Sequence, residues 1–195
     1  MKRNLLILIT ALTLALFCFC PVFAEEAAPE FTFLFDGMEA PITLATPPEE
    51  AAALLGEATQ YRKETLDPVG TFFTIINDSG LRFAGTECMR VVLSYYNDEL
   101  FMLSFYITED ALPDAQPLID ELTVRYGEGI ENTETGEPLL FLSPAPDRVW
   151  NVGEEISIEY YHIPENDAFA HMVGIQNKTA IQKLEAAFNQ SPFLQ

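Results

Sequence analysis

The sequence predicts an α+β fold made of two diverged units, each a helix followed by an antiparallel meander, forming one or more sheets with helices packed on one face. Three observations lead to this prediction. Residues 87–107 alternate around an Asn97-Asp98 turn, as in a hairpin with one buried side. Two short helical stretches, 46–56 and 115–127, each end at a glycine. The order of helix, loop and strands then recurs, and one such unit could not bury its sheet face alone.

Residues 1–24 are expected to be a signal peptide that is removed on export. Lys2 and Arg3 precede an apolar run from 5 to 19, and the residues at 22–24 form a small or aliphatic cleavage site. An uncleaved membrane anchor is the alternative, because the apolar run is close to the lower limit of about 17 residues for a bilayer span. We therefore expect a secreted or extracytoplasmic protein that meets a membrane only if this segment is retained.

Composition limits the classes of partner. The formal net charge is −20 at neutral pH, and such a field repels nucleic acid and anionic membrane surfaces while favouring solubility or a basic partner. No nucleic-acid partner is expected.

Cys18 and Cys20 follow bulky residues, which does not fit a lipid-modified cysteine. Cys88 alone remains after cleavage, so an intramolecular disulfide is excluded. We expect Cys88 to be a buried apolar side chain, with a reactive thiol or an intermolecular bridge as the alternative.

The first part of the exported chain, residues 25–45, is expected to be a flexible leader with a short strand at 31–35. The first unit spans residues 46–110. Its helix is predicted to start at a capping box formed by Thr46 and Glu49. The expected buried side of that helix consists of Ala51, Leu54 and Leu55, with Gly56 as the stop. The strands predicted to follow are 71–76, 81–83, 87–96 and 100–107.

The second unit spans residues 111–195. Asp114 is predicted to cap its helix, which runs from 115 to 126 and ends at Gly127. The predicted core residues of this helix are Ile119, Leu122 and Tyr126. The predicted strands are 148–150, 156–161 and 169–175, followed by a C-terminal helix from Thr179. Residues 156–161 resemble residues 91–96, which aligns Tyr160 with Tyr95.

The sequence has no recognised catalytic motif: a nucleophile elbow, a phosphate-binding glycine loop and a dinucleotide fingerprint are all missing. His162 and His171 are the only histidines, and two histidines without helical spacing are too few ligands for a zinc site. We therefore expect no metal and no cofactor.

Three acidic pairs are interpreted as solvated surface: Glu109-Asp110, Asp120-Glu121 and Glu154-Glu155. A glycosidase pair among the thirty carboxylates stays open, because sequence spacing does not fix their separation.

The strongest candidate for recognition is the sheet face opposite the helices. Tyrosines interleaved with small polar groups and an arginine give large contact area at low entropic cost. The alternative is a half-buried second face that lies beneath a loop or the C-terminal helix. The predicted binding residues are Arg90, Ser94, Tyr96, Ser104, Tyr106, Glu159 and Tyr161.

A helix that ends in Leu54-Leu55-Gly56-Glu57 and leads into a meander resembles the small modules of the outer-membrane-assembly lipoproteins. The tandem arrangement is similar to that of secreted β-lactamase-inhibitor proteins, in which an exposed sheet grips the enzyme. The likeness covers most of 47–176 and is architectural, so no functional residue is carried over. It implies a helix-and-meander fold and recognition of a protein through a sheet.

These observations favour a non-enzymatic binding protein that recognises another protein or a cell-envelope component through its exposed sheet face. The competing hypothesis is a secreted hydrolase that uses surface carboxylates, with His162 as a further catalytic candidate.

Overall fold

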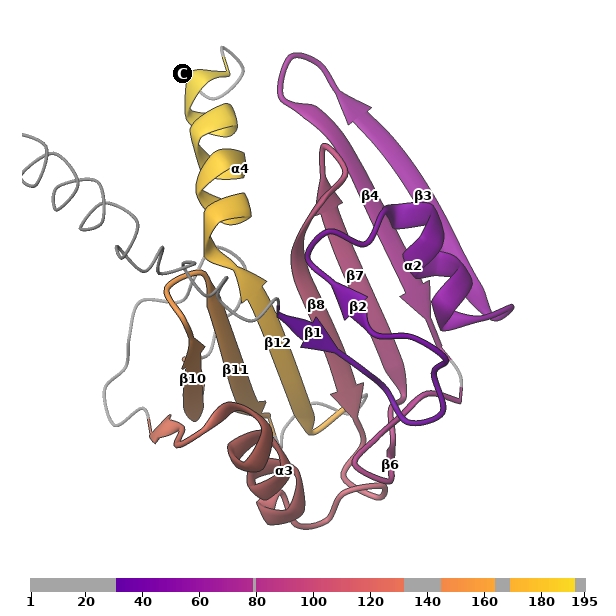
Figure 1. Cartoon of the computed structure of the whole chain (residues 1–195), viewed down its shortest axis with the longest axis vertical. Coiled ribbons are helices and arrows are strands. Elements are labelled where there is room, and N and C mark those ends of the chain that lie inside the picture. The colour runs from indigo at the N-terminus through magenta and orange to yellow at the C-terminus, as the bar shows by residue number, and fades with distance from the viewer. Residues whose placement is uncertain (1–30, 79, 132–144, 164–168, 192–195) are drawn as a thin grey trace, which may run out of the picture. The chain divides into compact units, whose positions relative to one another are not determined.

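The computed structural model describes residues 31–78, 80–131, 145–163 and 169–191. These residues form three helices and a central eight-stranded antiparallel sheet, which is the predicted α+β class (Figure 1). The strands lie side by side in the order β3 (Thr59–Leu66), β4 (Gly70–Asn77), β7 (Arg90–Tyr96), β8 (Glu99–Ile107), β12 (His171–Asn177), β11 (Ile156–His162), β10 (Arg148–Val152) and β9 (Ile130–Glu131). The predicted signal peptide, 1–24, and the start of the predicted leader lie outside the described residues.

The sheet is made of two meanders that meet at its centre. Helix α2 (Pro48–Leu55) precedes β3, β4, β7 and β8, and helix α3 (Gln116–Tyr126) precedes β9 to β12. The last strands of the two meanders, β8 and β12, pair with each other in antiparallel register. Tyr95 on β7 and Tyr160 on β11 each lie on the third strand of their meander and point into the same core. The helix-and-meander order therefore occurs twice, as the sequence predicts.

Two short strand pairs lie outside the main sheet. Strand β1 (Thr32–Phe33) pairs with β2 (Ile42–Thr43), and β5 (Arg82–Phe83) pairs with β6 (Thr86–Glu87). The first of these confirms a short strand in the region predicted at 31–35. Both pairs bring phenylalanines over the sheet, where they join the main core.

The larger core lies between the sheet and helices α2 and α3. Phe105 on β8 is at its centre and packs against the rings of Phe33, Phe35 and Phe83, with centroid separations of 5.8, 5.7 and 5.1 Å. These separations suit edge and tilted aromatic packing, which adds about 0.5–1.5 kcal/mol per pair beyond area burial. The helices contribute Ala51, Leu55, Leu118 and Leu122 to the same core.

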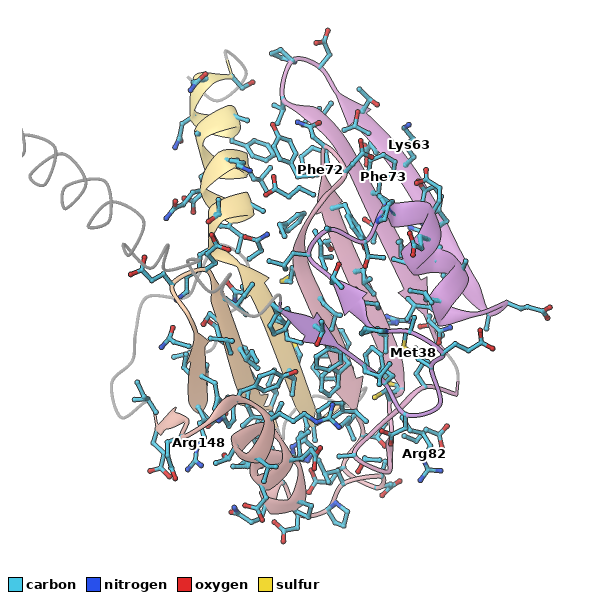
Figure 2. All side chains as sticks on the ribbon, viewed as in Figure 1. Met38, Lys63, Phe72, Phe73, Arg82 and Arg148 are labelled. Atoms are coloured by element: carbon cyan, nitrogen blue, oxygen red, sulfur yellow. The ribbon has the colours of Figure 1, made fainter. Side chains whose placement is uncertain are left out.

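The C-terminal helix α4 (Lys178–Gln190) packs on the opposite side of the sheet. Phe72 and Phe73 are neighbours on β4, yet Phe73 joins the larger core and Phe72 joins a second cluster beneath α4 (Figure 2). Leu184 of α4 and Tyr96 of β7 are the buried centre of this second cluster. The prediction that helices pack on one face thus holds for α2 and α3, and α4 departs from it.

The helix starts differ from the predicted ones by a residue or two. Helix α2 is preceded by Pro47, which supplies no side-chain cap, and Thr46 instead accepts a hydrogen bond from the Thr43 backbone N–H. The predicted capping box is therefore wrong, and the Glu49 carboxylate accepts from the Tyr61 hydroxyl at 2.8 Å. For α3 the Asp114 carboxylate does accept from the Gln116 N–H at 3.0 Å, although the residue that directly precedes the helix is Ala115.

Candidate functional site

The predicted binding residues do share the sheet face opposite the larger core. On β7, β8 and β11 the residues next to them in sequence, such as Leu93, Leu103 and Ile158, belong to the larger core. Because side chains alternate along a strand, the predicted binding residues point to the opposite face. Cross-strand pairing aligns them in rows: Arg90 lies opposite Tyr106 on the neighbouring strand. The period-two reading of the strands is therefore confirmed.

Much of this face is not open, which corrects the expectation of an exposed recognition surface. Tyr96, Ser104, Glu159 and Tyr161 are buried, with exposed fractions of 7, 2, 3 and 2%. Tyr96 lies against Leu184 of α4, and its hydroxyl donates to the Val69 carbonyl at 2.7 Å. These four residues are therefore structural. Of the other three, Ser94 and Tyr106 are half-buried and Arg90 is exposed.

The part of the face that remains accessible lies over β3, β4, β7 and β8. Cross-strand pairing places Arg62, Thr74, Ser94 and Met102 in one row across these strands. Arg62, at the β3 end of this row, is exposed, and the side chains of Thr74, Ser94 and Met102 are half-buried. We call this surface the open face and define it as Gln60, Arg62, Thr74, Ile76, Arg90, Val92, Ser94, Met102 and Tyr106.

On the other half of the face, Glu159 is a buried carboxylate with a complete set of donors. Its Oε2 accepts from the Gln176 side-chain N–H at 2.6 Å and from the Tyr161 hydroxyl, and its Oε1 accepts from the Ser157 hydroxyl at 3.4 Å. Burial raises the pKa of the Glu159 carboxyl, and the hydrogen bonds from Tyr161 and Ser157 oppose that shift. This network holds β11 against β12, and nothing in it presents a reactive group to solvent.

A second cluster of polar side chains lies at the end of the sheet where β8, β11 and β12 meet. His162, the last residue of β11, pairs with His171, the first residue of β12. The two imidazole rings are stacked, with centroids 4.9 Å apart and planes 6° apart. His171 is buried and His162 is exposed. The backbone N–H of His162 donates to the Asp147 carboxylate at 2.6 Å, which fixes the end of the strand.

Both nitrogens of His171 have partners. Its Nε2 lies 2.8 Å from the Leu112 carbonyl, which can only accept, so the neutral ring carries its proton on Nε2. Its Nδ1 lies 2.8 Å from the Tyr160 hydroxyl, which then donates to it. Burial lowers the pKa of His171, against contributions from the Leu112 hydrogen bond and from Glu109 that raise it. The ring is therefore held neutral and in one orientation.

Glu109 completes the cluster from the loop after β8. Its Oε2 lies 3.6 Å from Nε2 of His171 and 3.9 Å from Nε2 of His162. One ligand atom from each of Glu109, His162 and His171 lies within 4.8 Å of the other two. Sequence reasoning placed Glu109 on the solvated surface. It missed the cluster because only the β8–β12 register, which sets Ile107 opposite His171, brings the carboxylate to the histidines.

The thiol of Cys88 lies in the larger core. It is buried, which confirms the prediction of a buried apolar side chain, and it has no disulfide partner in the described part of the chain. Burial is the main cause that raises the pKa of the Cys88 thiol to about 12. The thiol stays protonated at neutral pH, and a protonated buried thiol is a poor nucleophile.

Comparison of the chain with protein-family models, with curated proteins and with solved structures found no significant match. Among the described residues, no helix has the length and apolar character that a membrane crossing requires.

Proposed function

We infer that the protein is an exported, non-enzymatic binding protein that recognises another protein or a cell-envelope component. The observation that carries this inference is the open face itself. It is an accessible stretch of regular sheet on which apolar side chains, Ile76, Val92 and Met102, alternate with polar ones. Helix α4 covers the cluster around Tyr96, and the rows next to that cluster stay accessible.

The charge on the open face supports a protein partner. The chain carries thirty acidic and ten basic residues, and two of the basic ones, Arg62 and Arg90, are exposed on this face. Arg90 is held by an ion pair with Asp78, with Nε 2.6 Å from the carboxylate oxygen, so its guanidinium is partly pre-ordered. Arginine beside a mixed apolar surface is typical of protein interfaces, whose centres are enriched in arginine, methionine and aromatic residues.

The experiment places new charge on the open face and compares it with the same charge elsewhere. The test variant is Ile76→Glu with Met102→Glu, two half-buried positions on adjoining rows of the face. The control is Val124→Glu with Ile130→Glu, since these apolar side chains are 81 and 65% exposed and lie outside the face. Both variants add two carboxylates, so the net charge is matched.

Each purified protein is immobilised and exposed to an extract of the cell envelope, and the captured material is identified and quantified. We expect a defined set of components to be retained by the parent chain and by the control, and to be lost on the test variant. Circular dichroism and a urea unfolding curve establish that the test variant is folded. Equal capture by all three proteins would overturn the assignment of the open face.

A further inference from the structure

We propose that Glu109, His162 and His171 form a binding site for one divalent transition-metal ion of the zinc type. The site lies at the end of the sheet where β11 ends at His162 and β12 begins at His171. It includes none of the residues of the open face. Three potential ligand atoms, two imidazole nitrogens and one carboxylate oxygen, already lie within 4.8 Å of one another. The two histidines come from paired strand ends, and Glu109 comes from the loop that follows Ile107, the residue opposite His171 on β8.

The donor set favours this class of ion. Imidazole nitrogen suits zinc, copper and nickel, whereas calcium and magnesium prefer sites made of oxygen ligands. Two histidines and a glutamate are a known three-ligand set for zinc, with a water molecule in the remaining position. The strongly acidic chain adds a favourable long-range field for any cation that approaches.

The distances are close to those of a zinc site, but the His162 ring must rotate out of its stack with His171, because two parallel rings cannot both direct an in-plane Nε2 lone pair at one ion. Zinc–nitrogen and zinc–oxygen bonds of about 2.0–2.2 Å in a tetrahedron place neighbouring ligand atoms roughly 3.4 Å apart. The Glu109 oxygen is already 3.6 and 3.9 Å from the two Nε2 atoms. Glu109 and His162 are exposed, so both side chains can move to close the site around His171, which is buried and fixed.

Metal binding needs a change of tautomer at His171. Its Nε2 must give up the proton that it donates to the Leu112 carbonyl, and the ring then carries the proton on Nδ1. The Leu112 oxygen, 2.8 Å from Nε2, must also turn aside to make room for the ion. At Nδ1 that proton can be donated to the Tyr160 oxygen, which lies 2.8 Å away. The ring stays neutral in both forms, so no net proton is released by this residue. Tyr160 is then a positioning residue, in the way that outer partners orient ligating histidines in known metal sites.

The test measures zinc binding to the tag-free protein after removal of metal with a chelator. Titration calorimetry and equilibrium dialysis give the affinity and the number of ions bound. The variants are Glu109→Gln and His162→Gln, both at exposed positions, and the control is Asp110→Asn, which removes an equal charge from the neighbouring exposed residue. We expect one ion per chain, at least about a tenfold loss of affinity in each ligand variant, and little change in the control.

Two further measurements use other ions: cobalt(II) gives a spectroscopic signal of binding, and magnesium tests the selectivity of the site. Cobalt bound to these ligands should show visible absorption of a low-coordinate complex, and His162→Gln should lose it. Magnesium in excess should not displace zinc. The proposal is overturned if zinc and magnesium compete equally, if Asp110→Asn weakens binding as much as Glu109→Gln, or if no saturable site is found, because each result describes only general attraction to an acidic surface.

Discussion

Tyr160 and His171 lie with their rings nearly parallel and their centroids 6.0 Å apart, and the Tyr160 hydroxyl is 2.8 Å from Nδ1 of His171. Tyr95 occupies the corresponding place on the third strand of the first meander, and it is fully buried. Its hydroxyl has no hydrogen-bond partner among the described residues. The two tyrosines occupy matching positions, and they differ in the hydrogen bonding of their hydroxyl groups.

This difference predicts opposite results for the same substitution. Tyr160→Phe leaves Nδ1 of the buried His171 without a donor, which should lower the free energy of unfolding by about 1–3 kcal/mol. Tyr95→Phe removes a buried hydroxyl that has no partner, so stability should stay the same or rise. Urea unfolding curves of both variants measure this. Equal destabilisation by the two changes would contradict the hydrogen-bond assignment at Tyr160.

A second prediction concerns the pH dependence of stability at Glu159. Burial raises the pKa of this carboxyl in the folded protein above its ordinary value of 4.5, so the folded state holds the proton more tightly than the unfolded state. The contribution of Glu159 to stability is therefore greatest at acid pH, and it falls as pH rises above 4.5 through the folded pKa.

Glu159→Gln removes this titration and keeps a side chain of the same shape. The difference in unfolding free energy, parent minus variant, should decrease from pH 4 towards pH 7 and then level off. The matched control is Glu154→Gln, at an exposed position on the turn between β10 and β11. The control measures the effect of removing one carboxylate from the surface, and it is subtracted from the result at Glu159. A parent-minus-variant difference that increases with pH at Glu159 would contradict the assigned direction.

The sequence identified the strands that have one strongly apolar side. In β7 and β8, alternation places Leu93 and Phe105 in the core and Ser94 and Tyr106 opposite, and the structure agrees. Strand β3 was missed, because its sequence from Thr59 to Leu66 is polar on both faces and nearly every side chain is exposed. An edge strand of this kind is defined by its backbone pairing with β4, which leaves no hydrophobic period to detect.

The two candidate sites depended on long-range placement that no local pattern contains. Alternation along a strand predicts on which face of the sheet a residue such as Tyr161 lies. It does not predict which other element packs on that face. The burial of Tyr96 depends on where α4 crosses the sheet, 88 positions later in the chain at Leu184 (184 − 96). The meeting of Glu109 with His162 and His171 likewise depends on which strand ends lie together.

A third prediction tests the packing around the single tryptophan. A Cβ added at Gly129 would lie 2.5 Å from Cε2 and 2.6 Å from Nε1 of Trp150, which is fully buried. Gly129→Ala should therefore displace the indole ring and lower the unfolding free energy by about 1–3 kcal/mol. Trp150 is the only tryptophan, so its fluorescence reports the displacement directly.

The control for that change is Gly153→Asn. Gly153 has a positive φ of 63° and no atom within 4 Å of an added Cβ, and asparagine tolerates this backbone region. We expect a small cost in stability and an unchanged emission maximum for the control. An emission maximum that stays unchanged in Gly129→Ala would show that the glycine does not support the position of the ring.

The last prediction concerns Asn177, which joins β12 to α4. Its side-chain oxygen accepts from the Ala180 N–H at 3.1 Å and caps the helix, while its side-chain N–H donates to the Leu100 carbonyl of β8 at 3.1 Å. Asn177→Ser keeps an oxygen for the cap and loses the amide N–H that donates to the Leu100 carbonyl. Asn177→Ala loses both. The serine variant should cost about 1–3 kcal/mol for the unpaired Leu100 carbonyl, and the alanine variant should cost roughly 1 kcal/mol more for the lost cap. Urea unfolding measures both costs. If the two variants were equally stable, the cap would contribute nothing, and the helix would be held on the sheet by side-chain contacts such as those of Leu184 and Phe188.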